Sequence, residues 1–246
     1  MQSQIRAITL DLDDTIWPFA SSLMRAEAAL DEWLLEHAPR AAERWPLHER
    51  ERLRERARVM QAHIAHDVTA VRLWMFEHML KEAGEDPALA GSAFDAYFAG
   101  RCDVEHYPDS VAALKRLAAR VPLAAVTNGN ACLRRIGLDH LFEFRITPGD
   151  HGAAKPDPSI FHAACARLGV SPADVLHVGD DPEMDVIGAA RAGLRSCWLN
   201  RSAGDGEYRP WSHDEVAPDL EFSTLTALAN WLDDPVGFSA RQGYQA

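Results

Sequence analysis

Apolar and polar positions along the chain follow two patterns, which divide it into two kinds of region. In the first, short apolar runs that end in polar residues alternate with helical repeats, which is typical of a parallel sheet covered by helices on both faces. The predicted strands cover residues 5–11, 121–127, 144–147, 174–179 and 194–199. The accompanying helices cover 109–120, 131–140, 157–168, 183–192 and 222–233, and residues 201–218 are predicted to be a loop. The pattern therefore indicates an α/β fold with a five-stranded parallel sheet.

Between the first two strands, residues 21–100 carry helical periodicity without a strand pattern. Ser21-Ser22 can cap the first helix of this segment, and Pro39 is expected to end it. Further helices are predicted at 47–65, 68–83 and 87–99. We therefore expect an all-helical cap domain at 21–100, inserted into a core formed by residues 1–20 and 101–246.

Composition narrows the classes of function. The 246 residues include 37 acidic and 25 basic side chains, and a formal net charge of −12 disfavours binding to a nucleic-acid backbone. The N-terminus shows no signal-peptide pattern, and no apolar run is long enough to span a membrane. The four cysteines are far apart and form no CxxC motif, which favours free thiols in a reducing compartment. These features predict a cytoplasmic protein without membrane or nucleic-acid partners.

A run of alternating charges, residues 49–58 (ERERLRERAR), lies in the second predicted helix of the cap. Glutamate precedes arginine by three positions in the pairs Glu49–Arg52, Glu51–Arg54 and Glu55–Arg58. Such spacing places opposite charges beside each other on a helix surface. The run therefore favours a solvated helix face, with a surface for a partner or substrate as the alternative.

Carboxylates crowd the ends of two predicted strands. Asp11, Asp13 and Asp14 follow the first strand in the segment DLDDT, and residues 179–185 (GDDPEMD) follow the fourth. An acidic turn or a helix cap could explain either segment alone. Parallel strands place their carboxyl ends at one edge of the sheet, so both clusters are expected to meet there. Carboxylates that close repel one another unless a cation intervenes, which favours a Mg²⁺ site.

Two further segments are suited to binding an anion. Thr127–Asn130 (TNGN) ends the second predicted strand and offers a hydroxyl, amides and backbone N–H groups, although Asn-Gly is also an ordinary turn. Lys155 stands between the third strand and the following helix, beside Pro156, which restricts the backbone. A lysine there can contact a phosphoryl oxygen, and an exposed loop lysine is the alternative.

In this order, the four motifs resemble the haloacid dehalogenase (HAD) superfamily of aspartate-nucleophile phosphatases. They are DxDxT at 11–15, TN at 127–128, KP at 155–156 and GDDxxxD at 179–185, each at a strand end or a helix start. The resemblance implies a Rossmann-like, three-layer α/β core carrying an inserted helical cap. Because all four motifs occur in order, the match is far more specific than any one of them.

The resemblance also implies a role for each matching residue. Asp11 would be the nucleophile that forms an aspartyl-phosphate, and Asp13 would act as acid and then as base. Thr127, Asn128 and Lys155 would bind the phosphate, and Lys155 would assist catalysis.

The same resemblance implies Mg²⁺ as the cofactor. Its ligands would be Asp11, the backbone carbonyl of Asp13, Asp180 and Asp185, with Asp181 as the alternative to Asp185. The metal and Lys155 would then reverse the local negative charge that otherwise repels a phosphate dianion.

Other segments resemble one bacterial branch, the phosphatases of flavin mononucleotide (FMN) and of the phosphorylated ribitylaminouracil intermediate of riboflavin biosynthesis. These segments are 66–69 (HDVT), 127–131 (TNGNA), 177–181 (HVGDD) and Cys197-Trp198. Residues 16–19 (IWPF) depart from the Tyr-Asp-Asn-like stretch that is more usual there. A small phosphorylated metabolite of this kind is therefore the expected substrate.

Three residues are candidates for recognising the leaving group. Trp17, together with Phe19, could stack on a planar ring, and packing between core and cap is the alternative for both. His66 is a candidate polar group facing the cleft, and Arg72 follows it where the branch carries basic residues.

The same sequence features leave three other functions open. A dehalogenase of the same fold would use an aspartate nucleophile but needs neither Asp13 nor the acidic cluster. A phosphomutase would retain both aspartates, and a non-catalytic binding protein would be expected to have lost motif residues. We expect a Mg²⁺-dependent phosphomonoester hydrolase acting as a monomer or weak homodimer.

Overall fold

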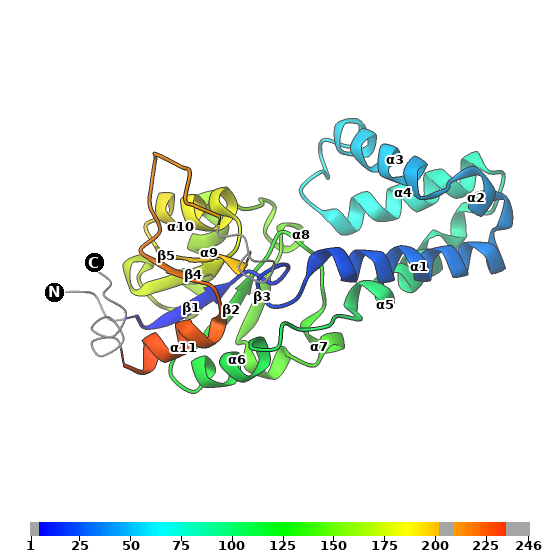
Figure 1. The fold of residues 1–246 in the computed structure, drawn as a ribbon. Helices are drawn as coiled ribbons and strands as arrows, with labels where there is room; N and C mark the ends of the chain where they lie inside the picture. The colour runs from blue at the N-terminus through cyan, green and yellow to red at the C-terminus, as the bar shows by residue number, and fades with distance from the viewer. Residues whose placement is uncertain (1–4, 202–208, 235–246) are drawn as a thin grey trace.

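The computed structural model describes residues 5–201 and 209–234 and contains a parallel six-stranded sheet between two helical layers (Figure 1). The strand order is β3-β2-β1-β4-β5-β6. Apolar side chains of α6 and α11 pack on one face and those of α9 and α10 on the other. The strands are β1 (Ala7–Leu10), β2 (Leu123–Val126), β3 (Phe144–Ile146), β4 (Val175–Gly179), β5 (Arg195–Leu199) and β6 (Leu220–Phe222). The α/β prediction is confirmed, with one strand more than expected.

The missed strand, β6, lies at the edge of the sheet. It has three residues and pairs in parallel with β5, for example Trp198 with Glu221. A strand of three residues is too short to show the alternation of apolar and polar positions by which strands are predicted. The helix predicted from residue 222 begins at Leu225 instead, where the Thr224 hydroxyl accepts a hydrogen bond from the Ala227 N–H.

The helices of the core are shorter than their patterns predict. The segment expected as one helix at 131–140 contains α7 and η2, and that at 183–192 is the π-helical turn η4 followed by α10. The core helices are α6 (Ser110–Ala118), α7 (Leu133–Ile136), η2 (Asp139–Leu141), α8 (Pro148–His151), α9 (Pro158–Leu168), η3 (Pro172–Asp174), η4 (Pro182–Ile187), α10 (Gly188–Arg191) and α11 (Leu225–Asp233).

The helical insertion between β1 and β2, Phe19–Cys102, has an apolar cluster of its own, in which Leu30, Phe76 and Leu80 are buried. In Figure 1, α1 and α5 run side by side from the sheet into the insertion. Its helices are α1 (Phe19–His37), α2 (Pro39–Arg44), α3 (Leu47–Met60), α4 (Val68–Glu82), η1 (Pro87–Leu89) and α5 (Ala90–Cys102). None of the helices in the described residues has the length and apolar character needed to cross a bilayer.

The start of α1 differs from the expected cap. The helix begins at Phe19, and the hydroxyls of Ser21 and Ser22 donate to the backbone oxygens of Pro18 and Phe19 instead of capping the first turn. Pro39 follows the end of α1 and is the first residue of α2.

Candidate active site

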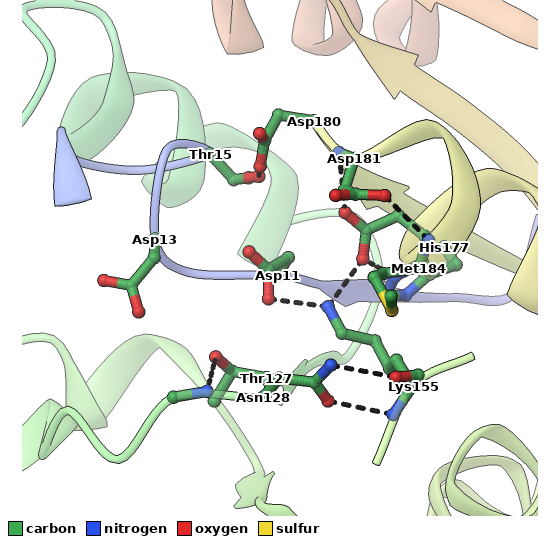
Figure 2. A network of polar contacts seen from close by, with 12 residues as sticks. Asp11, Asp13, Thr15, Thr127, Asn128, Lys155, His177, Asp180, Asp181 and Met184 are labelled. Carbon is green, nitrogen blue, oxygen red and sulfur yellow. Dashed lines mark hydrogen bonds and ion pairs between the residues drawn. The ribbon is translucent and has the colours of Figure 1, made fainter. Parts of the chain in front are cut away.

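The sheet topology brings the predicted motifs together at the carboxyl ends of the strands. β1 lies between β2 and β4, and Leu10 is in register with both Ala125 and Val178. The residues that follow these strands, among them Asp11 and Thr127, are therefore neighbours at one edge of the sheet. Figure 2 shows the side chains that converge there.

A buried lysine connects two of the aspartates. The Lys155 ammonium group donates to Asp11 Oδ1 at 2.6 Å and to Asp185 Oδ1 at 2.5 Å (Figure 2). Burial lowers the pKa of Lys155, but the charges of the two carboxylates outweigh it and raise the pKa above its ordinary value. Lys155 is thus a fixed cation at the end of β1, and the exposed-loop interpretation of this residue is wrong.

Asn128 holds the backbone of Lys155. Its side-chain oxygen accepts from the Lys155 N–H at 2.8 Å, and its amide donates to the Lys155 carbonyl at 2.9 Å. The amide side chain predicted to bind phosphate is thus occupied by the chain itself, which leaves the Asn128 backbone N–H for a ligand. The Thr127 hydroxyl accepts from the Gly129 N–H at 3.0 Å, so its own proton is available to a ligand.

Asp185 is held from three sides. Besides Lys155, His177 Nε2 lies 3.0 Å from Asp185 Oδ1, and the Asp181 N–H donates to Oδ2 at 3.0 Å. Burial lowers the pKa of His177, and because a carboxylate only accepts, it is the Nε2 proton that faces Asp185. Burial raises the pKa of Asp185, but Lys155 and His177 together hold it below its ordinary value. His177 begins the segment HVGDD at 177–181, and its contact with Asp185 was not predicted from the sequence.

The acidic cluster fits a divalent cation. Asp11, Asp180 and Asp185 each offer an oxygen, and these atoms all lie within 4.8 Å of one another. Burial raises the pKa of Asp11 to about 7 against the opposing charge of Lys155, and burial and neighbouring carboxylates raise that of Asp180 to about 8. Such carboxylates ionise together only when a further positive charge is present, and an all-oxygen set of this kind suits Mg²⁺.

The side chain of Asp181 serves a different purpose. It accepts from the N–H groups of Glu183 and Met184, both at 2.8 Å, and so caps the first turn of η4. The Asp180 carboxylate accepts from the Thr15 hydroxyl at 3.1 Å. Asp181, the alternative to Asp185, therefore caps a helix and lies outside the acidic cluster of Asp11, Asp180 and Asp185.

Asp13 is held by both connections between the core and the helical insertion. Trp17 Nε1 donates to Asp13 Oδ1 at 2.8 Å, and the Arg101 guanidinium contacts Oδ2 at 2.5 Å. Arg101 lies in the last turn of α5 and is buried. Burial raises the pKa of Asp13, and the charge of Arg101 and the Trp17 hydrogen bond oppose that rise. Sequence reasoning missed Arg101, because nothing in the chain links it to a residue 88 positions away.

The expected stacking of Trp17 on a substrate ring is wrong for this arrangement. Its side chain is fully buried within the core cluster, and its N–H is bound to Asp13. Phe19, 37% exposed, lines the adjacent cleft instead, with the Arg101 guanidinium over its ring. The packing alternative therefore holds for Trp17, while Phe19 can still contact a substrate.

A cleft of about 340 Å³ lies between the core motifs and the helical insertion. Arg72 lines it and pairs with Glu27 at 3.5 Å, with its guanidinium over the Tyr97 ring. His66 is half-buried and is not among the described residues that line this cleft, unlike its neighbour Ala65. The structure therefore brings Arg72, but not His66, to the site.

Comparison with known proteins agrees with this geometry. Residues 5–193 match the family described as haloacid dehalogenase-like hydrolase. The chain belongs to the haloacid dehalogenase-like hydrolase family. The resemblance seen in the motifs is thus confirmed, as is the predicted enzyme class of phosphoric monoester hydrolase.

Relatives of this hydrolase carry several activities. It is 34% identical to the 5-amino-6-(5-phospho-D-ribitylamino)uracil phosphatase YigB of Escherichia coli, over 93% of this chain and 97% of that protein. It is 30% identical to a glyceraldehyde 3-phosphate phosphatase of Methanopyrus kandleri, over 88% and 92% of the two chains. A crystal structure described as a 2-haloacid dehalogenase from Pseudomonas syringae is also similar, with 35% identity, a TM-score of 0.85 and coverage of 94% and 99%.

Proposed function

We propose that this hydrolase is a Mg²⁺-dependent phosphomonoesterase that forms an aspartyl-phosphate on Asp11. The observation that carries the proposal is the contact between Lys155 and Asp11 beside the acidic cluster of Asp180 and Asp185. A nucleophilic carboxylate beside a fixed cation and an all-oxygen metal site suits attack on a phosphoryl group. A haloacid dehalogenation would not require that metal site.

Each step follows from groups already in place. The Asp11 carboxylate attacks phosphorus while Lys155 and Thr127 hold the phosphoryl oxygens. Asp13, protonated at the start, gives its proton to the departing alkoxide, and a raised pKa favours that protonated form. The Asp13 carboxylate then removes a proton from the water that attacks phosphorus and releases phosphate, which regenerates Asp11.

The residues that would hold Mg²⁺ are Asp11, Asp180 and the backbone carbonyl of Asp13. The ion would neutralise charge on the phosphate dianion. Asp185 stands in the same cluster, but both its oxygens already accept hydrogen bonds from Lys155, His177 or the Asp181 N–H. We therefore assign Asp185 mainly to orienting Lys155. A direct bond to the metal would be an additional role.

We propose FMN, a phosphorylated ribitylaminouracil or a similar small metabolite as the substrate. The similarity to the Escherichia coli enzyme along nearly the whole chain supports this choice. The proposal assigns phosphate chemistry to the core, residues 1–20 and 101–246, and recognition of the leaving group to the cap, residues 21–100. The cytoplasmic location and the monomeric or weakly dimeric state stay predictions.

The test is release of phosphate from a panel of phosphomonoesters with Mg²⁺ and with EDTA. Release of halide from chloropropionate is measured alongside. We expect phosphate release that requires Mg²⁺ and no halide release. Full activity in EDTA would rule out a requirement for the metal. Release of halide without release of phosphate would show that the enzyme is a dehalogenase and not a phosphomonoesterase.

A further inference from the structure

The charge run in the helical insertion does not pair as its spacing suggests. Of the three predicted pairs on α3, the structure contains Glu49–Arg52, with 2.7 Å between the guanidinium and the carboxylate. Arg54 and Arg58 instead line the cleft above the catalytic motifs. Neither guanidinium makes a hydrogen bond or ion pair with another residue in 5–201 and 209–234.

The other cations of the cleft are already neutralised. Lys155 pairs with Asp11 and Asp185, and Arg101 pairs with Asp13. Arg72 pairs with Glu27, and the buried Arg50, which contacts the same carboxylate, also pairs with Asp31 at 2.6 Å. Among the described residues that line the cleft, Arg54 and Arg58 are therefore the cations whose charge is left for a ligand.

Unpaired arginines at this spacing are unfavourable in the free protein. Residues four positions apart lie on the same side of a helix, so the two positive charges repel each other. Arg54 is half-buried, and its charge acts on the hydroxyl of Tyr97, a buried residue of α5. Burial raises the pKa of that hydroxyl, and Arg72 and Arg54 oppose the rise. A negatively polarised ligand between the helices would offset the repulsion.

An apolar strip lies in the same cleft. Val68 and Val71 of α4 line it, three positions apart and so on one helix face, and Met75 of the same face is buried beneath the lining in the apolar cluster of the insertion. The cleft therefore offers an apolar surface for the body of a leaving group and two guanidinium groups for its polar atoms. The core motifs at the other end bind only the phosphoryl group.

We propose that Arg54 and Arg58 form a subsite for electronegative oxygens of the leaving alcohol, while its apolar part packs on the strip at Val68 and Val71. The proposal deepens, and rests on, the phosphomonoesterase assigned above. The recognised chemistry is an acceptor oxygen facing a guanidinium. Two sources can supply it: the carbonyl edge of a heterocyclic ring, as in FMN, or a second anionic group, as in a sugar bisphosphate.

The experiment measures binding in the Asp11→Asn protein, which binds esters without turning them over. Affinities for FMN, a hexose bisphosphate and phenyl phosphate are measured by calorimetry with Mg²⁺ present. Phenyl phosphate carries an apolar leaving group without an acceptor oxygen at its far end. The same three affinities are measured after Arg54→Gln, Arg58→Gln and both changes together.

Arg52→Gln combined with Arg56→Gln is the matched control. Both residues lie on α3 and are exposed, outside the cleft lining, so the control removes the same charge from the same helix. We expect FMN or the bisphosphate to bind more tightly than phenyl phosphate. The double change at Arg54 and Arg58 should reduce that preference roughly tenfold, as for loss of a charged hydrogen bond, and the control should not.

The outcomes separate this inference from the proposed function. No preference over phenyl phosphate, a preference that survives the double change, or an equal loss in the control would overturn the subsite. A preference for FMN or for the bisphosphate identifies the source of the oxygens. If the unaltered enzyme with Mg²⁺ hydrolyses none of the esters, the proposed function fails, while the affinities still decide the subsite.

Discussion

The charged residues at the two sides of the cleft differ in pairing. The core side, called the floor, carries paired charges, whereas the α3 side, called the wall, carries unpaired ones. On the floor, Asp11, Lys155 and Asp185 are buried, and the Lys155 ammonium group lies within 2.6 Å of both carboxylates. On the wall, Arg54 and Arg58 stand half-buried and exposed without a partner among the described residues. Charges fixed in advance stabilise a transition state without reorganisation. Charges that are unpaired in the free protein can form new ion pairs or hydrogen bonds when a ligand binds, and so contribute to its affinity.

We therefore expect substitutions on the floor and on the wall to alter different kinetic quantities. Changes on the floor should lower the rate for every ester, because every substrate has the same phosphoryl group. Changes on the wall should alter the ratio between substrates, because only there do leaving groups differ.

The largest expected effect is from Asp11→Asn. An amide cannot form the acyl phosphate, so kcat for FMN and for phenyl phosphate should both fall by several orders of magnitude. Steady-state phosphate release measures the rates, and thermal unfolding checks that the fold survives. Retention of the original rate in a preparation free of other phosphatases would place the nucleophile elsewhere.

Asp13→Asn should have the next largest effect. Loss of proton transfer to the alkoxide is expected to cost roughly 10²–10⁴ in kcat. The loss should be smaller for p-nitrophenyl phosphate, because nitrophenolate departs without protonation. An equal loss for that ester and for an alkyl phosphate would argue against Asp13 as the acid.

Trp17→Phe separates the two interpretations of Trp17. It retains an aromatic ring but removes the N–H that donates to Asp13 at 2.8 Å. Loss of the hydrogen bond that orients the Asp13 carboxyl group predicts a fall in kcat of about tenfold. Because Trp17 is buried, the ratio of kcat/KM between FMN and phenyl phosphate should stay unchanged. A selective loss of FMN hydrolysis would return this residue to substrate recognition.

The smallest effect concerns a charged pair away from the chemistry. Asp109 binds Arg201 at 2.9 Å and accepts from the Leu225 N–H at 2.7 Å, at the start of α11. Burial raises the pKa of Asp109, but Arg201 and the backbone N–H groups hold it below its ordinary value. Asp109→Asn should therefore lower the free energy of unfolding by about 1–2 kcal/mol, as for a lost helix cap.

The pH dependence of that loss has a definite sign. A carboxyl group with a lowered pKa in the folded state stabilises the fold above its unfolded pKa, and the stabilisation disappears as it becomes protonated. The difference between the two proteins in urea unfolding should be full near neutral pH and shrink as the pH falls below about 4. If the difference in unfolding free energy were independent of pH, the loss of stability in Asp109→Asn would be due to packing and not to the charge of Asp109. Activity should change little.

The residues of the catalytic floor could be predicted from the sequence, whereas the residues of the cleft wall could not, for a physical reason. Asp11, Thr127 and Asp180 follow parallel strands, and strand geometry alone places such residues at one edge. The pairing of Arg101 with Asp13 depends on how a distant helix returns to the core. Likewise, i,i+3 spacing on α3 could not reveal that Arg54 faces a cleft, since that depends on the packing of α3 on its neighbours.

Other differences have local causes. β6 has three residues at the edge of the sheet, too few for a period-two pattern. The buried position of Trp17 follows from the loop after β1, in which the backbone N–H of Asp14 donates to the Trp17 carbonyl at 2.7 Å. That return of the chain turns the indole toward Asp13, and no periodicity encodes it.

The most direct test of the account is to trap the phosphoryl group on Asp11. The Asp13→Asn protein is mixed with p-nitrophenyl phosphate and Mg²⁺, so that the first step proceeds while water activation is impaired. After an acid quench, borohydride reduces an acyl phosphate to homoserine, which peptide mass spectrometry locates. The account predicts homoserine at position 11 and nowhere else. An unmodified Asp11, with the phosphoryl group on another residue or on none while nitrophenol is released, would contradict it.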